Sequence, residues 1–254
     1  MIEIKVLGCG SSLGVPVIGC NCNVCVSDSP CNKRLRSSLL INYLDKNILI
    51  DFGQDVRQQL LRENIKKIDS AILTHIHSDH VSGIDDLRPF HMVNKLPPID
   101  IYSDSFTFEL FKNRFPYLDK SEYFNKIIID CYEERLINDV KFQFFKQDHG
   151  TMDSIGFRIC NFAYANDLIN FYQESEKYLY NLEILIIDCI SYESTNTHSG
   201  LSKILKWNEQ FSPKRIYLTN MSHRIDYFDI QKILPNNIMP LFDGQIMRIE
   251  KAEL

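Results

Sequence analysis

The chain has 254 residues, of which 44% are hydrophobic and 24% charged, and its formal net charge is -5 at pH 7. These proportions are typical of a globular protein with a sizeable core and favour one domain over two. The acidic balance argues against a dedicated nucleic-acid surface, so a long nucleic acid is not an expected partner. Apolar runs are too short to cross a membrane and the start lacks a signal-peptide pattern, so we expect a soluble, cytoplasmic protein without a membrane partner.

Apolar runs that alternate or are rich in β-branched residues recur along the chain and predict strands. They cover residues 3–7, 47–51, 71–74, 99–102, 126–129, 140–144, 185–188 and 215–219. Helical patterns between several of them predict helices over residues 54–63, 105–115 and 199–207. The stretches 92–98 and 162–179 are interpreted as loops or surface elements. Alternating strands and helices, without a repeat or a flexible linker, indicate a single α/β domain over residues 1–254.

The most informative motif is the run Thr-His-Ile-His-Ser-Asp-His at residues 74–80, which directly follows an apolar strand. Because side chains alternate along a strand, His75 and His77 can reach the same side, while Asp79 and His80 can serve a neighbouring ion. Exposed histidines can also simply decorate a loop. Three of the chain's 7 histidines around one aspartate make that interpretation the weaker one, and the spacing suggests two metals.

Polar residues recur at the ends of the predicted strands. Asp51, the run 75–80, Asp188 and Asn220 each follow an apolar strand directly. In α/β proteins, chemistry is usually located at the carboxyl edge of the sheet, so we expect these residues to gather there.

These motifs together resemble a known family. The segments 49–53 (Leu-Ile-Asp-Phe-Gly), 75–80 and 148–150 (Asp-His-Gly), with Asp188, are similar to those of the metallo-β-lactamase-fold hydrolases. The N-terminal segment 7–25 resembles the branch that contains phosphoribosyl cyclic phosphate phosphodiesterases. The resemblance implies an αββα sandwich, with two mixed sheets flanked by helices and metals at one edge.

The resemblance also implies a ligand set for two divalent cations, zinc or manganese. The first ion would be held by His75, His77 and His149, the second by Asp79 and His80, and Asp188 would bridge them. Imidazoles suit such ions, and a carboxylate has two oxygens with which to span two cations. Asp51 is a candidate to orient the ligand loop, or else a plain turn aspartate at the strand end.

A cysteine cluster near the N-terminus indicates a further metal site. Cys20, Cys22 and Cys25 supply three thiolates, one short of a closed structural zinc site. In the resembled branch the fourth ligand is a histidine near the C-terminus, which His223 matches, while Cys31 is the rival and unligated thiols are the third alternative. The other cysteines lie beside apolar runs and are interpreted as small buried hydrophobes: Cys9, Cys131, Cys160 and Cys189.

One position departs from the family pattern. Relatives commonly carry a histidine ligand of the second metal where this chain has Asn220. A neutral amide is a weaker ligand, so the second site should bind less tightly or prefer a harder ion such as manganese or magnesium. A one-metal enzyme and a catalytically idle metal-binding protein are the alternatives.

The expected activity is hydrolysis of a phosphodiester, most simply a small cyclic phosphate or nucleotide-like ester, by a metal-activated hydroxide. Asp79 would orient the nucleophile. His198, which matches a substrate-facing position of the family, would protonate the leaving group, unless it is an exposed histidine near a helix cap. A nuclease that processes tRNA 3′ ends is the alternative enzyme, and a homodimer is an open expectation.

Three arginines and one further histidine complete the candidates. Arg34, Arg36 and Arg88 are candidate phosphate clamps, although a solvated charge explains each of them more simply. His91 matches no ligand position of the family and is interpreted as a surface or helix residue.

Overall fold

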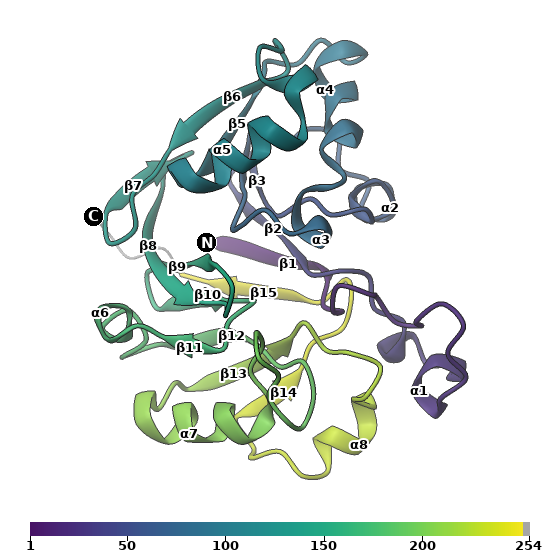
Figure 1. The fold of residues 1–254 in the computed structure, drawn as a ribbon. Coiled ribbons are helices and arrows are strands. Elements are labelled where there is room, and N and C mark those ends of the chain that lie inside the picture. The colour runs from purple at the N-terminus through teal and green to yellow at the C-terminus, as the bar shows by residue number, and fades with distance from the viewer. Residues whose placement is uncertain (251–254) are drawn as a thin grey trace.

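The computed structural model describes residues 1–250 and consists of two β-sheets that face each other, with helices on the outside (Figure 1). The first sheet is 7-stranded with the order β15-β1-β2-β3-β4-β5-β6. Strands β3 to β6 run parallel, so their carboxyl ends lie at one edge. The strand bounds are β1 Ile2–Gly8, β2 Ser38–Tyr43, β3 Lys46–Ile50, β4 Ser70–Ile72, β5 Ile99–Ser103, β6 Phe124–Ile128 and β15 Ile246–Ile249.

The second sheet is 8-stranded with the order β11-β8-β9-β10-β12-β13-β14, and β7 pairs with β8. Strands β10, β12, β13 and β14 are parallel to one another, so this sheet also gathers several carboxyl ends at one edge. The bounds are β7 Glu134–Ile137, β8 Val140–Asp148, β9 Asp153–Ile159, β10 Phe162–Ala165, β11 Asn170–Phe171, β12 Ile184–Asp188, β13 Arg215–Thr219 and β14 Ile238–Pro240.

The helices flank the two sheets, with α2 to α5 beside the first sheet and α7 and α8 beside the second (Figure 1). Within residues 1–250, no helix is long and apolar enough to cross a membrane. The bounds are α1 Asn23–Val26, α2 Val56–Arg62, α3 Ser78–Val81, α4 Arg88–Met92, α5 Ser105–Arg114, α6 Gln173–Glu176, α7 Leu201–Phe211 and α8 Tyr227–Gln231. Short 3₁₀ turns cover Pro30–Asn32, Ile84–Leu87 and Pro116–Leu118.

The apolar runs of the sequence are continuous because the inner strands are buried on both faces. In β3, Ile48 and Ile50 belong to the core cluster shared with the second sheet, whereas Leu49 belongs to the cluster beneath α2 to α5. Alternate side chains of one strand therefore serve two different cores. The predicted αββα architecture is confirmed, since two mixed sheets lie between helices.

One stretch differs from its prediction. Residues 162–179, interpreted as a loop or surface element, contain the buried strand β10 as well as β11 and α6. All four residues of β10 are buried, and two of them are alanines. A strand covered on both faces has no polar alternation, and its short Phe-Ala-Tyr-Ala sequence carries little β-branched signal.

Candidate metal centre

The polar residues that follow the strands meet at one edge, where the two sheets converge. From the first sheet come Asp51 after β3 and the run 75–80 after β4, and from the second come Asp167 after β10, Asp188 at the end of β12 and Asn220 after β13. Parallel strands bring their carboxyl ends to the same edge, which explains why residues distant in sequence become neighbours.

Three histidines form the first ligand set. The ring nitrogens Nε2 of His75 and Nε2 of His149 lie 3.0 Å and 3.1 Å from Nδ1 of His77. The remaining nitrogens of the two outer rings are bound elsewhere, His75 Nδ1 to Thr74 Oγ1 and His149 Nδ1 to the Thr197 carbonyl. Burial lowers the pKa of His75 and of His77, which favours the neutral imidazoles that bind metals. The set therefore fits a borderline ion such as zinc or manganese.

The second set combines an imidazole with carboxylates. His80 Nε2 lies 2.6 Å from Asp167 Oδ2 and 3.3 Å from Asp79 Oδ2. Burial opposes protonation of His80, but Asp167, Asp51 and Asp79 outweigh it and raise the pKa of His80 well above its usual range. So much negative charge around one imidazole suits a divalent cation.

Asp51 lies behind the second set and orients it. Its Oδ2 is 2.7 Å from His80 Nδ1, and it accepts hydrogen bonds from the Thr74 backbone amide at 2.8 Å and the Thr74 hydroxyl at 2.9 Å. The carboxylate thus fixes one His80 ring nitrogen and the start of the ligand loop, the arrangement that the sequence suggested for it.

The carboxylate between the two sets is that of Asp167, a residue that the sequence analysis did not single out. Its oxygen lies with nitrogens of His75 and His80 in one group and with those of His149 and His198 in another, with all ligand atoms of each group within 4.8 Å of one another. The signal that could have identified it is the pattern already used for Asp51: an apolar run, here β10, followed directly by polar residues.

The bridging role predicted for Asp188 is therefore corrected in favour of Asp167. Asp188 is fully buried, and its Oδ2 accepts from the Leu168 amide at 3.2 Å and lies 2.9 Å from His198 Nδ1. Its Oδ1 accepts from Asn220 Nδ2 at 3.0 Å. Both oxygens are already engaged by protein donors, so Asp188 supports the site from behind.

Asn220 turns its amide nitrogen, not its oxygen, toward the centre of the site. Nδ2 donates to Asp167 Oδ1 at 2.9 Å as well as to Asp188. The side chain thus orients two carboxylates and offers no ligand atom in this geometry. The second set is left with three protein ligands, Asp79, His80 and Asp167.

His198 lies beside this set, three residues before α7 begins. Its burial would lower its pKa, but the adjacent Asp188 outweighs that effect and raises the pKa of His198 to about 9. Its ring centroid is 4.8 Å from that of His149, and the ring also borders a small pocket. The position is suited to protonating an atom of a bound ligand.

Three of the polar residues after the strands have an unusual backbone conformation. Asp51, Asp167 and Asn220 all have positive φ, at 58°, 54° and 57°, a region that Asp and Asn tolerate better than other side chains. Gly53 allows a close approach, since a Cβ there would lie 1.8 Å from the Asp79 carbonyl oxygen. The glycine of the Asp-Phe-Gly segment is therefore needed for close contact with the ligand loop.

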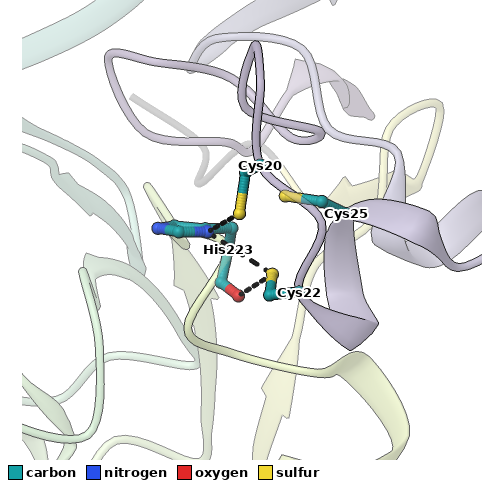
Figure 2. Close-up of side chains that lie close together, drawn as sticks. All are labelled: Cys20, Cys22, Cys25 and His223. Carbon is teal, nitrogen blue, oxygen red and sulfur yellow. Dashed lines mark hydrogen bonds between the residues drawn. The ribbon is translucent and has the colours of Figure 1, made fainter.

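The cysteine cluster meets the C-terminal histidine, as Figure 2 shows. Nδ1 of His223 lies 3.3 Å from Cys20 Sγ and 3.5 Å from Cys22 Sγ, and Cys25 completes a group whose ligand atoms all lie within 4.8 Å. A hydrogen bond from the Cys25 backbone lowers the pKa of Cys22 to about 6, so this thiol is a thiolate at neutral pH. Cys31, the rival ligand, lies outside the group, and the donors fit a tetrahedral zinc ion.

The three arginines considered as phosphate clamps all bind groups of the protein itself. Arg34 is buried and donates to the carbonyls of Ser222 and Ile225, contrary to both the clamp and the solvated-charge interpretation. Arg36 forms an ion pair with Asp55, and Arg88 pairs with Asp85.

The remaining candidates lie away from the metal centre. His91 lies in α4, with Nδ1 2.9 Å from the Leu96 carbonyl. Of the cysteines predicted to be buried, Cys9 and Cys189 are, whereas Cys131 and Cys160 are half-buried.

Comparison with known proteins agrees with this architecture. The family model of the beta-lactamase superfamily domain matches residues 46–221. The chain belongs to the metallo-β-lactamase superfamily. Within it, the chain is similar to a solved diphosphatase from the PhnP family, with 33% identity, a TM-score of 0.94 and coverage of 99% of both chains.

The sequence of this superfamily member is also similar to parts of two curated relatives. It is 30% identical over 247 residues to an octanoyltransferase of Porphyromonas gingivalis, which covers 94% of this chain but only 50% of that protein's length. It is 34% identical over 89 residues to ribonuclease Z of Clostridium beijerinckii, covering 34% of this chain and 24% of that one. The chain thus spans half or less of these two relatives, whereas it matches the PhnP-family diphosphatase throughout.

Proposed function

We propose that the chain is a metal-dependent hydrolase that cleaves a P–O bond in a small phosphodiester or diphosphate ester. The observation that carries the proposal is the position of Asp167 between two sets of ligands, His75, His77 and His149 on one side and Asp79 and His80 on the other. The likeness to a PhnP-family diphosphatase over 99% of the chain supports phosphorus chemistry.

Two divalent cations, zinc or manganese, would supply an activated water and neutralise charge on the phosphoryl oxygens. The protein's own contribution is positioning. Asp79, whose carboxylate faces His80, would hold the attacking water in line. His198, oriented by Asp188 through its Nδ1 at 2.9 Å, would give a proton to the leaving oxygen. Asn220 leaves the second ion with fewer protein ligands, so we expect that ion to be the more weakly held.

The test is a hydrolysis assay on protein loaded with manganese or zinc, combined with a measurement of metal content. Bis(p-nitrophenyl) phosphate, a nucleoside 2′,3′-cyclic phosphate, a dinucleoside diphosphate and a tRNA precursor separate the substrate classes. We expect turnover of at least one of the small substrates and loss of it in Asp167→Asn. Cleavage of the tRNA precursor alone would indicate the nuclease alternative, and no turnover by a folded, metal-loaded protein would indicate an idle metal-binding protein.

The Cys20, Cys22, Cys25 and His223 group is proposed to hold one structural zinc. This assignment predicts that zinc remains bound there after mild chelation removes the active-site ions, because four protein ligands close the coordination sphere. A cytoplasmic location and a homodimer stay predictions.

A further inference from the structure

Three buried polar side chains surround the main chain at Asp167. Gln147 in β8, Ser154 in β9 and Asn166 directly after β10 are each at most 1% exposed. A polar group that is buried without hydrogen bonds destabilises a folded protein, so such residues are retained where their bonds matter. The bonds that these three side chains form converge on Asp167 and the residue before it.

Two of the three side chains hold the backbone. Gln147 Nε2 donates to the Asn166 carbonyl at 3.0 Å, and Ser154 Oγ donates to the Asp167 carbonyl at 2.7 Å. The φ of Asp167 is 54°, a conformation that is less favourable for a residue with a side chain. The two hydrogen bonds therefore fix the main chain in the conformation that directs the Asp167 carboxylate into the metal centre.

Asn166 contacts the carboxylate of Asp167 directly. Its Nδ2 donates at 2.9 Å to Asp167 Oδ2, the oxygen that lies 2.6 Å from His80 Nε2. Asn220 Nδ2 donates to the other oxygen, Oδ1, also at 2.9 Å. One amide thus holds each oxygen, which fixes the plane of the carboxylate. Because a carboxylate has about four lone-pair sites, two amide donors leave it able to ligate cations.

Only one half of the Asn166 amide forms a hydrogen bond. Within residues 1–250, its Oδ1 is buried without a hydrogen-bond partner. An unpaired buried acceptor lowers the stability of the folded state, and an apolar side chain at this position would avoid that penalty. The amide is therefore explained by its contact with Asp167, and not by a contribution to the stability of the fold.

We infer that Asn166 is a positioning residue of the metal centre, which together with Asn220 holds the Asp167 carboxylate between the two ligand sets. The inference rests on the proposed function, in which Asp167 is the ligand that two ions share. A ligand that is already oriented loses less freedom when the ions bind, so the amide pair raises their affinity. Asn166 acts through Asp167, because a side chain that is 1% exposed does not reach a substrate.

The test is the affinity for Mn²⁺, measured by titration calorimetry on protein that keeps its structural zinc. We expect Asn166→Ala to weaken the binding of active-site Mn²⁺ by about 10–100-fold, as is usual when a group that supports a metal ligand is lost. Asn166→Val, which fills more of the space and has no donor, should show the same loss. The thermal midpoints of both variants should lie within a few degrees of the wild-type value, because the unpaired Oδ1 is removed as well.

Kinetics distinguish a positioning role from a catalytic one. At a low Mn²⁺ concentration, the variants should lose activity in proportion to the ions that they fail to bind. At saturating Mn²⁺, kcat should return close to the wild-type value, because Asn166 does not contact the substrate. A kcat that stays low with the ions bound would overturn the positioning role.

Asn161→Ala is the matched control. Asn161 precedes β10 at the opposite end from Asp167, and its Nδ2 donates to Glu183 Oε2 at 2.7 Å. Like Asn166, it has a buried Oδ1 without a hydrogen-bond partner in the described part of the chain. The two asparagines thus differ in the carboxylate that they contact, and Asn161→Ala should leave the Mn²⁺ affinity unaltered.

The outcomes separate this inference from the proposed function. Equal Mn²⁺ affinity of wild type and folded Asn166→Ala, with turnover intact, would overturn the positioning role and leave the proposed function standing. An equal loss of affinity in Asn166→Ala and Asn161→Ala would also reject it, because the effect would then be general. A loss in Asn166→Ala alone, in a protein that hydrolyses no substrate, would retain the positioning role and reject the hydrolase.

Discussion

Asp167 and Asp188 are both buried carboxylates of the metal centre, yet their neighbours assign them different tasks. Asp167 touches the ligand His80 at 2.6 Å, whereas Asp188 is engaged by His198, Leu168 and Asn220. We expect Asp167→Asn to lower kcat by at least about 10³-fold and to release metal, because the shared ligand is lost. Asp188→Asn should weaken metal affinity or activity by about 10–100-fold, as is usual for a supporting group.

Metal content by mass spectrometry and kinetics on the same samples check this pair of variants. Both substitutions preserve side-chain volume, and circular dichroism checks that each variant keeps the fold. If Asp188→Asn lost the metals while Asp167→Asn retained them, Asp188 and not Asp167 would be the bridging residue.

Asn220 offers a second test at the scale of one residue. Its amide nitrogen faces Asp167 and Asp188 and supplies no ligand atom to the second set. Replacing it by histidine should raise the affinity of the second ion, because imidazole is a stronger ligand than an amide. We expect Asn220→His to retain close to two active-site ions per chain, besides the structural zinc, after dialysis at a chelator concentration that removes one active-site ion from the wild type. Equal retention by both folded proteins would refute this account of the weaker site.

At the scale of elements, the sequence was informative wherever a strand carried its own signal. His75, His77, Asp79 and His80 lie within six residues after one strand, so the sequence alone could predict that they come together. Asp167 was missed together with β10, because a fully buried four-residue strand with two alanines shows neither alternation nor β-branched residues. Asp188 was predicted to bridge the ions because it ends a recognisable strand, β12. The sequence does not show that β10 pairs with β12, and this pairing brings Asp167 to the same sheet edge as Asp188.

The segment between β14 and β15 contains a carboxylate whose ionisation opposes folding. Asp243 accepts hydrogen bonds from the amides of Cys9 and Leu35 at 3.1 Å and 2.8 Å, yet burial raises its pKa from 3.8 to about 6. The folded protein therefore binds this proton more tightly than the unfolded chain. The stabilisation is complete below about pH 4 and is lost as the pH rises through 6, which costs about 3 kcal/mol at neutral pH.

Asp243→Asn removes this titration. Urea unfolding at half-unit steps from pH 4.5 to pH 8 should show a smaller decrease in unfolding free energy with rising pH for the variant than for the wild type. Parallel curves for the two proteins would show that Asp243 does not contribute to this pH dependence.

At the scale of the whole molecule, several contacts attach the N-terminal arm to the body, among them the Asn32–Asp226 hydrogen bond at 2.7 Å, and two further contacts act as anchors. Of residues 10–38, none belongs to either core cluster. One anchor is the buried Arg34, which donates to the Ser222 and Ile225 carbonyls at 3.2 Å and 3.0 Å. The other is the cysteine site, where Cys20 meets His223 across 203 residues of sequence. Figure 1 shows the arm with α1 extending from the two sheets.

This arrangement predicts that loss of the zinc site loosens the arm and leaves the fold intact. Cys22→Ser should bind about one zinc ion fewer per chain and be cleaved by protease within residues 13–31 at least about tenfold faster, because local opening there no longer breaks a metal site. The main thermal transition should move by only a few degrees, since the core clusters and the Arg34 anchor remain. Cys31→Ser is the control within the same arm, because Cys31 lies outside the ligand group. Global unfolding of Cys22→Ser would mean instead that the metal site holds the two sheets together, and that the core buried between them does not suffice without it.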